Sequence, residues 1–444
     1  MRIKNWSFPY ALGYVLVYQG IRGFYKKFQA VGLENIPKDK PVIFAANHQN
    51  AFMDPVVIAV HLKKPVYYMV RADIFKKPAV AKILASINMM AIYRQRDGGN
   101  TIEKNKAVFD YCYDLLQKNR PIIIFVEGNQ GKEKNLRPVQ KGVFRIGLGA
   151  EEKYNNELDV HIVPIGIYYS DTVNMGSKML INYGKPLKIK DYLAQYDNDE
   201  AKTINSLKSE VTARMGDLMV DIKSGDYYTT VHELMFAFEK EIFEKEGGKK
   251  NSVIEEFNCQ KGFIAKAEKW IEENPSEAQD LKTTVEEFSK EVPKQGLRYW
   301  LFQKEKQSPF IFILFLIIGF PIHLYGILNS YLPYKLPAIF VKKKIKDIHF
   351  HSSLKMAMGT FLFWVFWALQ TFIVALCFDY YIWAYYFVSL PITALISYRY
   401  WITILKTKGM LKYNKLSKSK DAQFLQLKEK RDRMAEVLEK IYAN

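Results

Sequence analysis

A histidine and a carboxylate that could act together lie in the run NHQNAFMD at residues 47–54, where His48 precedes Asp54 by six positions. A neutral imidazole can take a proton from an alcohol at physiological pH, and a nearby carboxylate can fix its tautomer and stabilise the imidazolium that forms. We interpret His48 and Asp54 as a candidate catalytic pair that generates an alkoxide. Such a pair is more often structural when it stands alone, so the interpretation depends on the residues that accompany it.

The spacing predicts that His48 lies in a loop just before a helix. Six residues of helix turn roughly 600°, which would leave the two side chains on different faces. The apolar run at 42–46 predicts a strand that ends just before His48, and we expect the helix to start around Phe52 or Asp54. Asp54 precedes Pro55, a pattern typical of an N-cap followed by the first helical residue. A carboxylate engaged in capping would be less free to orient His48.

Two later runs carry groups that bind phosphate, AIYRQRDGG at 91–99 and FVEGNQGKEKNLRPVQKG at 125–142. Arginine can grip a phosphate through two bonds, and a glycine-bearing turn after a strand presents backbone amides without obstruction. Glu127 would repel a phosphate unless it pairs with an arginine or accepts the hydroxyls of the substrate. Taken singly, Arg94 and Glu127 would more often form a surface ion pair. The candidate anion-binding residues are Arg94, Arg96, Gly128, Asn129, Lys132, Arg137 and Lys141.

Four blocks occur in a fixed order, NHQNAFMDP at 47–55, the two runs above, and VPIGIYY at 163–169. Together with the phrase VGLENIPKDKPVIFAANH at 31–48, this order resembles the glycerol-phosphate acyltransferase superfamily, whose members move a fatty acyl group from a thioester to a glycerol hydroxyl. The resemblance covers about residues 31–185. It implies that His48 is the catalytic histidine, that Arg94, Glu127 and Gly128 bind the acceptor, and that Pro164 lies on the acyl-chain side.

The sequence departs from the family pattern at three positions. Five residues separate His48 from Asp54, where the family usually has four; a similar separation belongs to a subgroup that includes glycerol-3-phosphate and dihydroxyacetone-phosphate acyltransferases with appended membrane segments. Val126 and Asn129 stand where the family usually has Pro and Thr or Ser, and the Asn129 amide could replace the missing hydroxyl donor. Pro164 could equally be a proline at a strand edge.

The expected function is that of a membrane-bound O-acyltransferase in phospholipid synthesis, with His48 as general base and glycerol 3-phosphate or 1-acylglycerol 3-phosphate as acceptor. We expect no cofactor, with acyl-CoA or acyl-carrier protein as co-substrate. Two alternatives stay open: transfer to another lipid hydroxyl, on a lysophospholipid or a hydroxyacyl amino-acid lipid, and non-catalytic lipid binding or transfer. The sequence leaves the oligomeric state open.

The composition of the chain favours a membrane as partner over nucleic acid. Its 444 residues include 64 Lys and Arg against 46 Asp and Glu, a net charge of +18, which suits either partner. Aromatic residues make up 15% of the chain, two long charge-free stretches lie near its end, and no nucleic-acid motif is present. Cys112, Cys259 and Cys377 are far apart and odd in number, which predicts neither disulfides nor a metal site and indicates a reducing compartment.

Residues 31–190 are expected to form an α/β catalytic domain, a mixed sheet with flanking helices, because short apolar runs alternate there with amphipathic stretches. A charged helical region at 191–306 and a C-terminal membrane helical segment should follow. The expected strands are 42–46, 66–70, 90–93, 122–126, 161–167 and 179–183, and the expected helices are 56–62, 79–87, 101–116 and 142–152.

The remaining segments are expected to meet a membrane. Residues 1–30 predict a helix lying in the membrane interface, or else one packed on the catalytic domain, and not a signal peptide. Within a membrane region at 307–404, residues 356–398 predict a hairpin of two spans bracketing Asp379. Basic clusters at 342–346 and 406–420 place both ends of this hairpin on the cytosolic face, where we also expect the catalytic domain and the basic tail at 405–444. Within this tail, residues 421–442 predict a free amphipathic helix. Residues 309–341 should therefore re-enter or lie in the interface, with Pro321, Pro333 and Pro337 making bends.

Overall fold

Two units make up the chain in the computed structural model. One comprises Met1–Val220 and Pro337–Phe361, and the other comprises Asp221–Leu336 and Leu362–Asn444. The structure describes residues 8–62, 65–93, 101–249, 252–304, 306–378 and 381–443.

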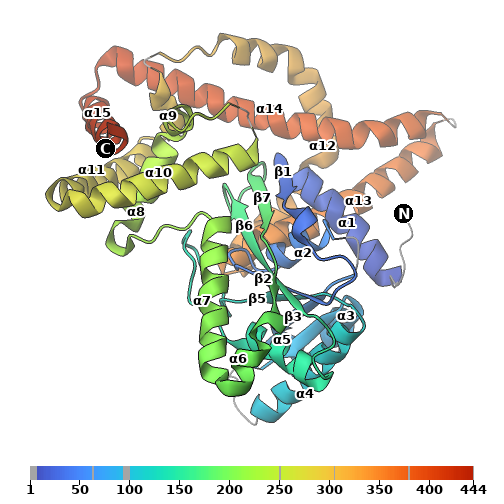
Figure 1. Cartoon of the computed structure of the whole chain (residues 1–444). Coiled ribbons are helices and arrows are strands. Elements are labelled where there is room, and N and C mark those ends of the chain that lie inside the picture. Colours follow the sequence, from blue (N-terminus) through green and yellow to red (C-terminus); the bar gives the residue numbers. More distant parts are fainter. Residues whose placement is uncertain are drawn as a thin grey trace. The chain divides into compact units, whose positions relative to one another are not determined.

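The first unit is built on an eight-stranded mixed sheet with strand order β1-β7-β6-β2-β5-β3-β4 and β8 beside β6 (Figure 1). β6 pairs parallel with β2 but antiparallel with β7 and β8. The all-apolar run of β2 is buried throughout, as expected for a central strand. The predicted α/β fold class is confirmed. The strands are β1 (Lys27–Val31), β2 (Val42–Ala46), β3 (Tyr67–Arg71), β4 (Met89–Ile92), β5 (Ile122–Phe125), β6 (His161–Tyr169), β7 (Lys178–Tyr183) and β8 (Leu187–Lys188).

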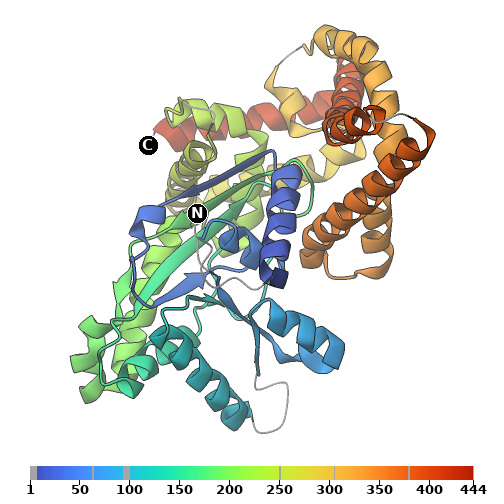
Figure 2. The same ribbon diagram turned by 90° about the vertical axis from the view of Figure 1, so that its right-hand side faces the viewer.

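Helices cover both faces of this sheet, α1 (Phe8–Phe24) and α2 (Met53–Ala59) on one side and α4 (Thr101–Gln117), α5 (Gly142–Lys153) and α7 (Glu200–Leu218) on the other (Figures 1 and 2). Shorter helices are α3 (Pro78–Ser86) and α6 (Leu193–Asn198). Side chains alternate between the faces along each strand, so Phe44 and Ala46 pack with α2 while Ile43 and Ala45 pack with α5. The sheet therefore has two apolar cores, the α2-side core on one face and the α5-side core on the other.

All the strands and helices expected in residues 31–190 are present, with ends shifted by a few residues. Two strands were not predicted: β1, whose sequence KFQAV mixes polar and apolar residues, and the two-residue β8. The unit also continues past residue 190, because α7 buries Ile204, Leu207 and Val211 against the sheet. The charged region expected to begin at 191 thus starts with a helix of the catalytic unit.

The N-terminal helix α1 packs on the catalytic unit, the second of the two expected arrangements. Ile21 and Phe24 are buried in the α2-side core, and the Tyr14 hydroxyl donates to the Val60 carbonyl at 2.8 Å. Leu12 and Val15, on another part of the helix, remain exposed. One face of α1 therefore packs on the catalytic unit, and the apolar side chains of another face remain exposed.

In the second unit, the last helix, α15, packs within a group of helices. They are α8 (Tyr228–Ala237), α9 (Glu239–Lys245), α10 (Val253–Glu273), α11 (Pro275–Lys294) and α15 (Ala422–Ala443). α15 packs on α10 and α11, burying Phe424, Leu427 and Leu438, and Lys430 pairs with Glu287 and Glu291. The prediction of a free tail helix is wrong, because its apolar stripe has a partner within the chain.

Among the described residues, three helices are long and apolar enough to cross a membrane. They belong to α12 (Phe310–Lys344), α13 (His351–Cys377) and α14 (Ile382–Ser419), and the last two correspond to the expected hairpin. Asp379, between them, lies outside the described residues. α12 is assigned as one helix through all three of its prolines. In the second unit it runs beside α14, where the Tyr400 hydroxyl donates to the Leu316 carbonyl at 2.7 Å.

Candidate active site

The loop between β2 and α2 holds His48, as the spacing predicts. Asn47 anchors this loop to the neighbouring strand β6: its side-chain oxygen accepts from the Ile167 amide at 2.7 Å, and its side-chain nitrogen donates to the Ile167 carbonyl at 3.1 Å. α2 begins at Met53, within the expected range. His48 therefore follows directly from a fixed point at the end of the central strand.

Asp54 contacts His48 and fixes the loop at the same time. The His48 Nδ1 lies 2.8 Å from the Asp54 Oδ2, and that oxygen also accepts from the amides of Gln49 and Asn50, each at 2.8 Å. Phe52 occupies the N-cap position, so the prediction that Asp54 is the N-cap is wrong. From inside the first turn of α2, the Asp54 carboxylate points back into the loop. The same carboxylate oxygen therefore binds the loop amides and the His48 Nδ1 together.

The other oxygen of Asp54 accepts a hydrogen bond from Tyr169, at the end of β6. The distance between the Tyr169 hydroxyl and the Asp54 Oδ1 is 2.6 Å, and both side chains are fully buried. Burial and the adjacent Asp54 charge raise the pKa of Tyr169 well above its usual value, so this hydroxyl stays a donor. An ionised carboxylate only accepts, so the His48 Nδ1 carries the proton and the Nε2 carries the lone pair.

The His48 ring is supported by Phe125 and lies beside Gln130. It stacks on Phe125 with ring centroids 4.1 Å apart, and the Gln130 side-chain nitrogen lies 3.2 Å from the Nε2. The side chain is 13% exposed, whereas Asp54 is completely buried. The histidine is thus the partly exposed member of this pair, with the Gln130 amide beside its Nε2.

Glu127 and Arg137 form an ion pair behind the histidine. The Arg137 Nη2 donates to the Glu127 Oε2 at 2.7 Å and to the His48 carbonyl at 3.0 Å, while the His48 amide donates to the same Glu127 oxygen at 2.6 Å. Glu127 is thus paired with an arginine, one of the two arrangements expected for it. Arg137 is committed to Glu127 and the His48 backbone, so its visible role is to brace the histidine loop.

The turn after β5 brings the glycines of the third block next to the histidine. Gly128 adopts a φ of 72°, which a side chain would strain, and its amide donates to the Phe125 carbonyl at 3.1 Å. The Gly131 amide donates to the His48 carbonyl at 3.1 Å, and Asn129 accepts from Arg137. Asn129 thus steadies the turn through Arg137.

The other predicted anion-binding residues fall into two groups. Lys132 and Lys141 are exposed, one in the loop after the turn and one directly before α5. Arg94 and Arg96 lie outside the described residues, so their role in acceptor binding stays a prediction.

Pro164 lies on the other face of the sheet from His48. Its neighbours Val163 and Ile165 pack in the α2-side core, and a Cβ at Gly184 would lie 3.0 Å from the Pro164 ring and 2.6 Å from Leu218 of α7. The Pro164 carbonyl accepts from the Gly184 amide where the antiparallel partner of β6 changes from β8 to β7. A missing amide is tolerated at such a break. The structure therefore does not group Pro164 with the histidine.

Three residues around the histidine were not singled out from the sequence. Phe125 and Gln130 lie in the third block and Tyr169 ends the fourth, so the blocks themselves contained the signal. Lys134 also reaches the site: its ammonium donates to the Tyr169 carbonyl at 2.6 Å. Burial lowers the pKa of Lys134 to about 8, against the opposing effect of Asp171.

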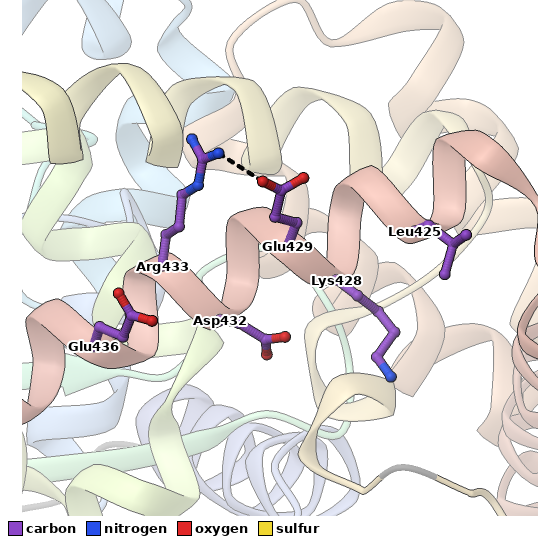
Figure 3. Close-up of a pocket in the computed structure, with 6 residues that line it drawn as sticks. All are labelled: Leu425, Lys428, Glu429, Asp432, Arg433 and Glu436. Carbon is purple, nitrogen blue, oxygen red and sulfur yellow. Dashed lines mark hydrogen bonds and ion pairs between the residues drawn. The ribbon is translucent and has the colours of Figure 1, made fainter.

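Within the described residues we also looked for a metal-binding cluster and for a second candidate site in the hollow on α15. No group of three or more His, Cys, Asp or Glu side chains could hold a metal ion within the described parts of the chain. A hollow of about 540 Å³ lies in the second unit and is lined by Leu425, Lys428, Glu429, Asp432, Arg433 and Glu436. Figure 3 shows that all six project from α15 and that Arg433 is paired with Glu429. Side chains from a single helix do not make an enclosed site.

Comparison with known proteins points to one family. The acyltransferase family model matches residues 27–168. Glycerol-3-phosphate O-acyltransferase 1 of Saccharomyces cerevisiae is 21% identical over 305 residues, 50% of this chain and 40% of the relative. A 1-acyl-sn-glycerol-3-phosphate acyltransferase of Chlamydomonas reinhardtii is 26% identical over 170 residues, 38% of this chain and 44% of the relative. The chain thus spans less than half the length of these curated relatives.

Among solved structures, the chain is similar to the 1-acyl-sn-glycerophosphate acyltransferase PlsC from Thermotoga maritima. It is 18% identical, with a TM-score of 0.34 over 46% of this chain and 78% of the other. The family match covers both the histidine loop and the Glu127 turn. Over residues 27–168 the chain is therefore similar to the acyltransferase family, and its curated relatives are glycerol-3-phosphate and 1-acylglycerol-3-phosphate acyltransferases.

Proposed function

We propose that the protein is a membrane-bound O-acyltransferase that moves a fatty acyl group from a thioester to a hydroxyl of glycerol 3-phosphate or 1-acylglycerol 3-phosphate. The observation that carries the proposal is the polarised histidine: a buried carboxylate that accepts four hydrogen bonds holds the His48 Nδ1, and the His48 side chain is partly exposed. Lipid binding alone would not require such an arrangement. The family match over the same residues supports it.

In the proposed reaction, the His48 Nε2 takes the proton of the acceptor hydroxyl while Asp54 stabilises the imidazolium. The alkoxide attacks the thioester carbonyl, forming the new C–O bond. The C–S bond then breaks and the thiolate takes the proton back from His48. A thiol with a pKa near 8.5 leaves readily, so no covalent enzyme intermediate is required. The donor is acyl-CoA or acyl-carrier protein, without a further cofactor.

The proposed acceptor carries a phosphate, as the glycerol-3-phosphate and 1-acylglycerol-3-phosphate acceptors in the names of the two relatives do. Lys132 and Lys141, both exposed on the segment that follows the Glu127 turn, are proposed to supply positive charge to the acceptor site. Because Arg137 is committed to Glu127, the arginines left to grip the phosphate through two bonds are Arg94 and Arg96. Asn129 and the Gly128 turn complete the proposed acceptor site.

The proposed membrane topology keeps α12 from crossing completely. α13 and α14 as a hairpin return the chain to its starting side, and α15 packs on α10 and α11, which precede α12. Both ends of α12 then lie on one side. Inside the second unit α12 runs along α14, with His323 beside Ser397 and, further on, Asn329 beside Tyr386. Beyond Asn329 the centroid of the Tyr334 ring lies 6.2 Å from that of the Tyr398 ring, so α12 bends back along α14 while it remains helical. We propose that it enters to about Asn329 and returns, with the catalytic unit on the cytoplasmic face.

The acceptor assignment is tested with the purified full-length protein in detergent. It is offered isotope-labelled acyl-CoA with glycerol 3-phosphate, 1-acylglycerol 3-phosphate, a lysophospholipid or monoacylglycerol, and the product is identified by mass spectrometry. We expect product from the first two acceptors only. Equal transfer to monoacylglycerol would refute recognition of the phosphate. Tight retention of lipid with no product from any acceptor would favour the lipid-binding alternative.

A further inference from the structure

A buried hydrogen bond joins the histidine loop to the first turn of α13. The Ser352 hydroxyl donates to the Asn50 side-chain oxygen at 2.7 Å, and both residues are fully buried. The Asn50 side-chain nitrogen in turn donates to the Thr172 carbonyl, in the loop between β6 and β7, at 2.9 Å. Ser352 lies 302 residues from Asn50 in the sequence, yet both belong to the first unit.

Asn50 is also one of the residues that fix the catalytic carboxylate. Its backbone amide donates to the Asp54 Oδ2, the same oxygen that lies 2.8 Å from the His48 Nδ1. The Asn50 side chain therefore sets the direction of an amide that aims Asp54 at the histidine. Without the Ser352 donor, the buried Asn50 oxygen would lack a partner and the side chain would be free to reorient.

Other contacts hold the beginning of α13 against the same loop. The Phe350 ring packs edge-on against Phe52 with centroids 5.2 Å apart. The Lys355 ammonium donates to the Val173 carbonyl at 2.7 Å, one residue beyond the carbonyl that Asn50 contacts. Met356 is buried in the α2-side core. The start of α13 is thus a structural part of the catalytic unit, and the same helix continues as a candidate membrane span.

We propose that Ser352 is a positioning residue for the reaction, acting through Asn50 to hold Asp54 against His48. The inference rests on the proposed role of His48, and it extends the working parts of the site to the base of the C-terminal helical segment. None of the four sequence blocks contains Ser352.

A double-mutant cycle tests the path through Asn50. We expect Ser352→Ala to lower kcat roughly 3- to 10-fold, the effect of one lost buried hydrogen bond, with KM for both substrates changed less than about twofold. In an Asn50→Ala background the same substitution should have no further effect. Ser353→Ala is the matched control, because Ser353 is also buried but its hydroxyl donates to the Phe350 carbonyl, just before α13, and it should leave kcat unchanged.

A second readout needs no substrate. The rate at which diethyl pyrocarbonate modifies His48, followed by peptide mass spectrometry on the folded full-length protein, reports how firmly the ring is held. We expect Ser352→Ala to raise this rate at least about twofold, and Ser353→Ala to leave it unchanged. The proposal would be overturned if Ser352→Ala lowered kcat by the same factor in the wild-type and in the Asn50→Ala backgrounds. An unchanged modification rate of His48 in Ser352→Ala would also overturn it. If the wild-type protein transfers no acyl group, the proposed function fails while the modification rates still decide this inference.

Discussion

Removal of the Arg137 side chain separates two roles for this residue, phosphate binding and support of the histidine loop. The Glu127 side chain is 1% exposed and that of Arg137 is 22% exposed, so Arg137→Ala leaves a buried carboxylate without its cation. Loss of one partner of a buried ion pair costs about 3–5 kcal/mol, and a change of this size should lower the thermal midpoint of the catalytic unit by roughly 5–15 °C. Because the His48 carbonyl loses a donor as well, turnover should fall together with stability.

The assay is thermal unfolding of the purified protein in one detergent, monitored by tryptophan fluorescence, alongside initial rates of transfer. The double variant Glu127→Gln with Arg137→Met removes both charges and should recover at least half of the lost midpoint, since no uncompensated charge stays buried. Lys132→Ala is the control on the same loop, exposed, and should leave the midpoint within about 1 °C. An Arg137→Ala protein with an unchanged midpoint and a raised KM for the phosphate acceptor would refute the supporting role.

Three further predictions concern other contacts. Tyr169→Phe should lower transfer roughly 3- to 10-fold by removing a donor from Asp54, whereas Tyr183→Phe, whose hydroxyl lies 3.5 Å from its acceptor, should not; equal rates for the two would contradict the role of Tyr169. Burial lowers the pKa of Lys134 to about 8 in the folded protein, so above that pH the unfolded chain binds more protons than the folded one. The thermal midpoint should therefore rise between about pH 8 and 10.5, and Lys134→Met should abolish this rise. An identical pH profile of the midpoint in the variant would contradict the prediction. Phe424→Ala should destabilise the second unit by about 3–5 kcal/mol, while the exposed neighbour Leu425 tolerates the same change; proteolysis of α15 measures the difference, and equal cleavage of both variants would argue against docking of this helix.

Local patterns in the sequence were sufficient for the elements of the sheet and for the histidine loop. The run at 42–46 is apolar throughout and bounded by a proline and polar residues, which defines β2, and the spacing of His48 and Asp54 requires a loop followed by a helix. The two short strands β1 and β8 depend on pairing with β7 and β6, so nothing in their own residues indicates them.

Partners that are distant in the sequence decided the parts that could not be predicted. Arg137 is expected to bind phosphate by its type alone, and only the fold shows that Glu127 already holds it. The stripe on α15 looks free until α10 and α11 are seen to cover it. The contact between Asn50 and Ser352 spans 302 residues, and no local signal marks it. The charge of a side chain and the periodicity of its segment do not indicate which residue, distant in the sequence, that side chain contacts in the fold.

The central claim is that the His48 Nε2 takes the proton from the acceptor hydroxyl. The most direct measurement is the initial rate of acyl transfer to glycerol 3-phosphate by the wild-type protein and by His48→Ala, with the thermal midpoint of both proteins as a check on folding. A positioned base contributes about 10² to 10⁴ in rate, so the variant should lose at least a hundredfold at an unchanged midpoint. A folded His48→Ala protein that keeps more than about a tenth of the wild-type rate would contradict the account.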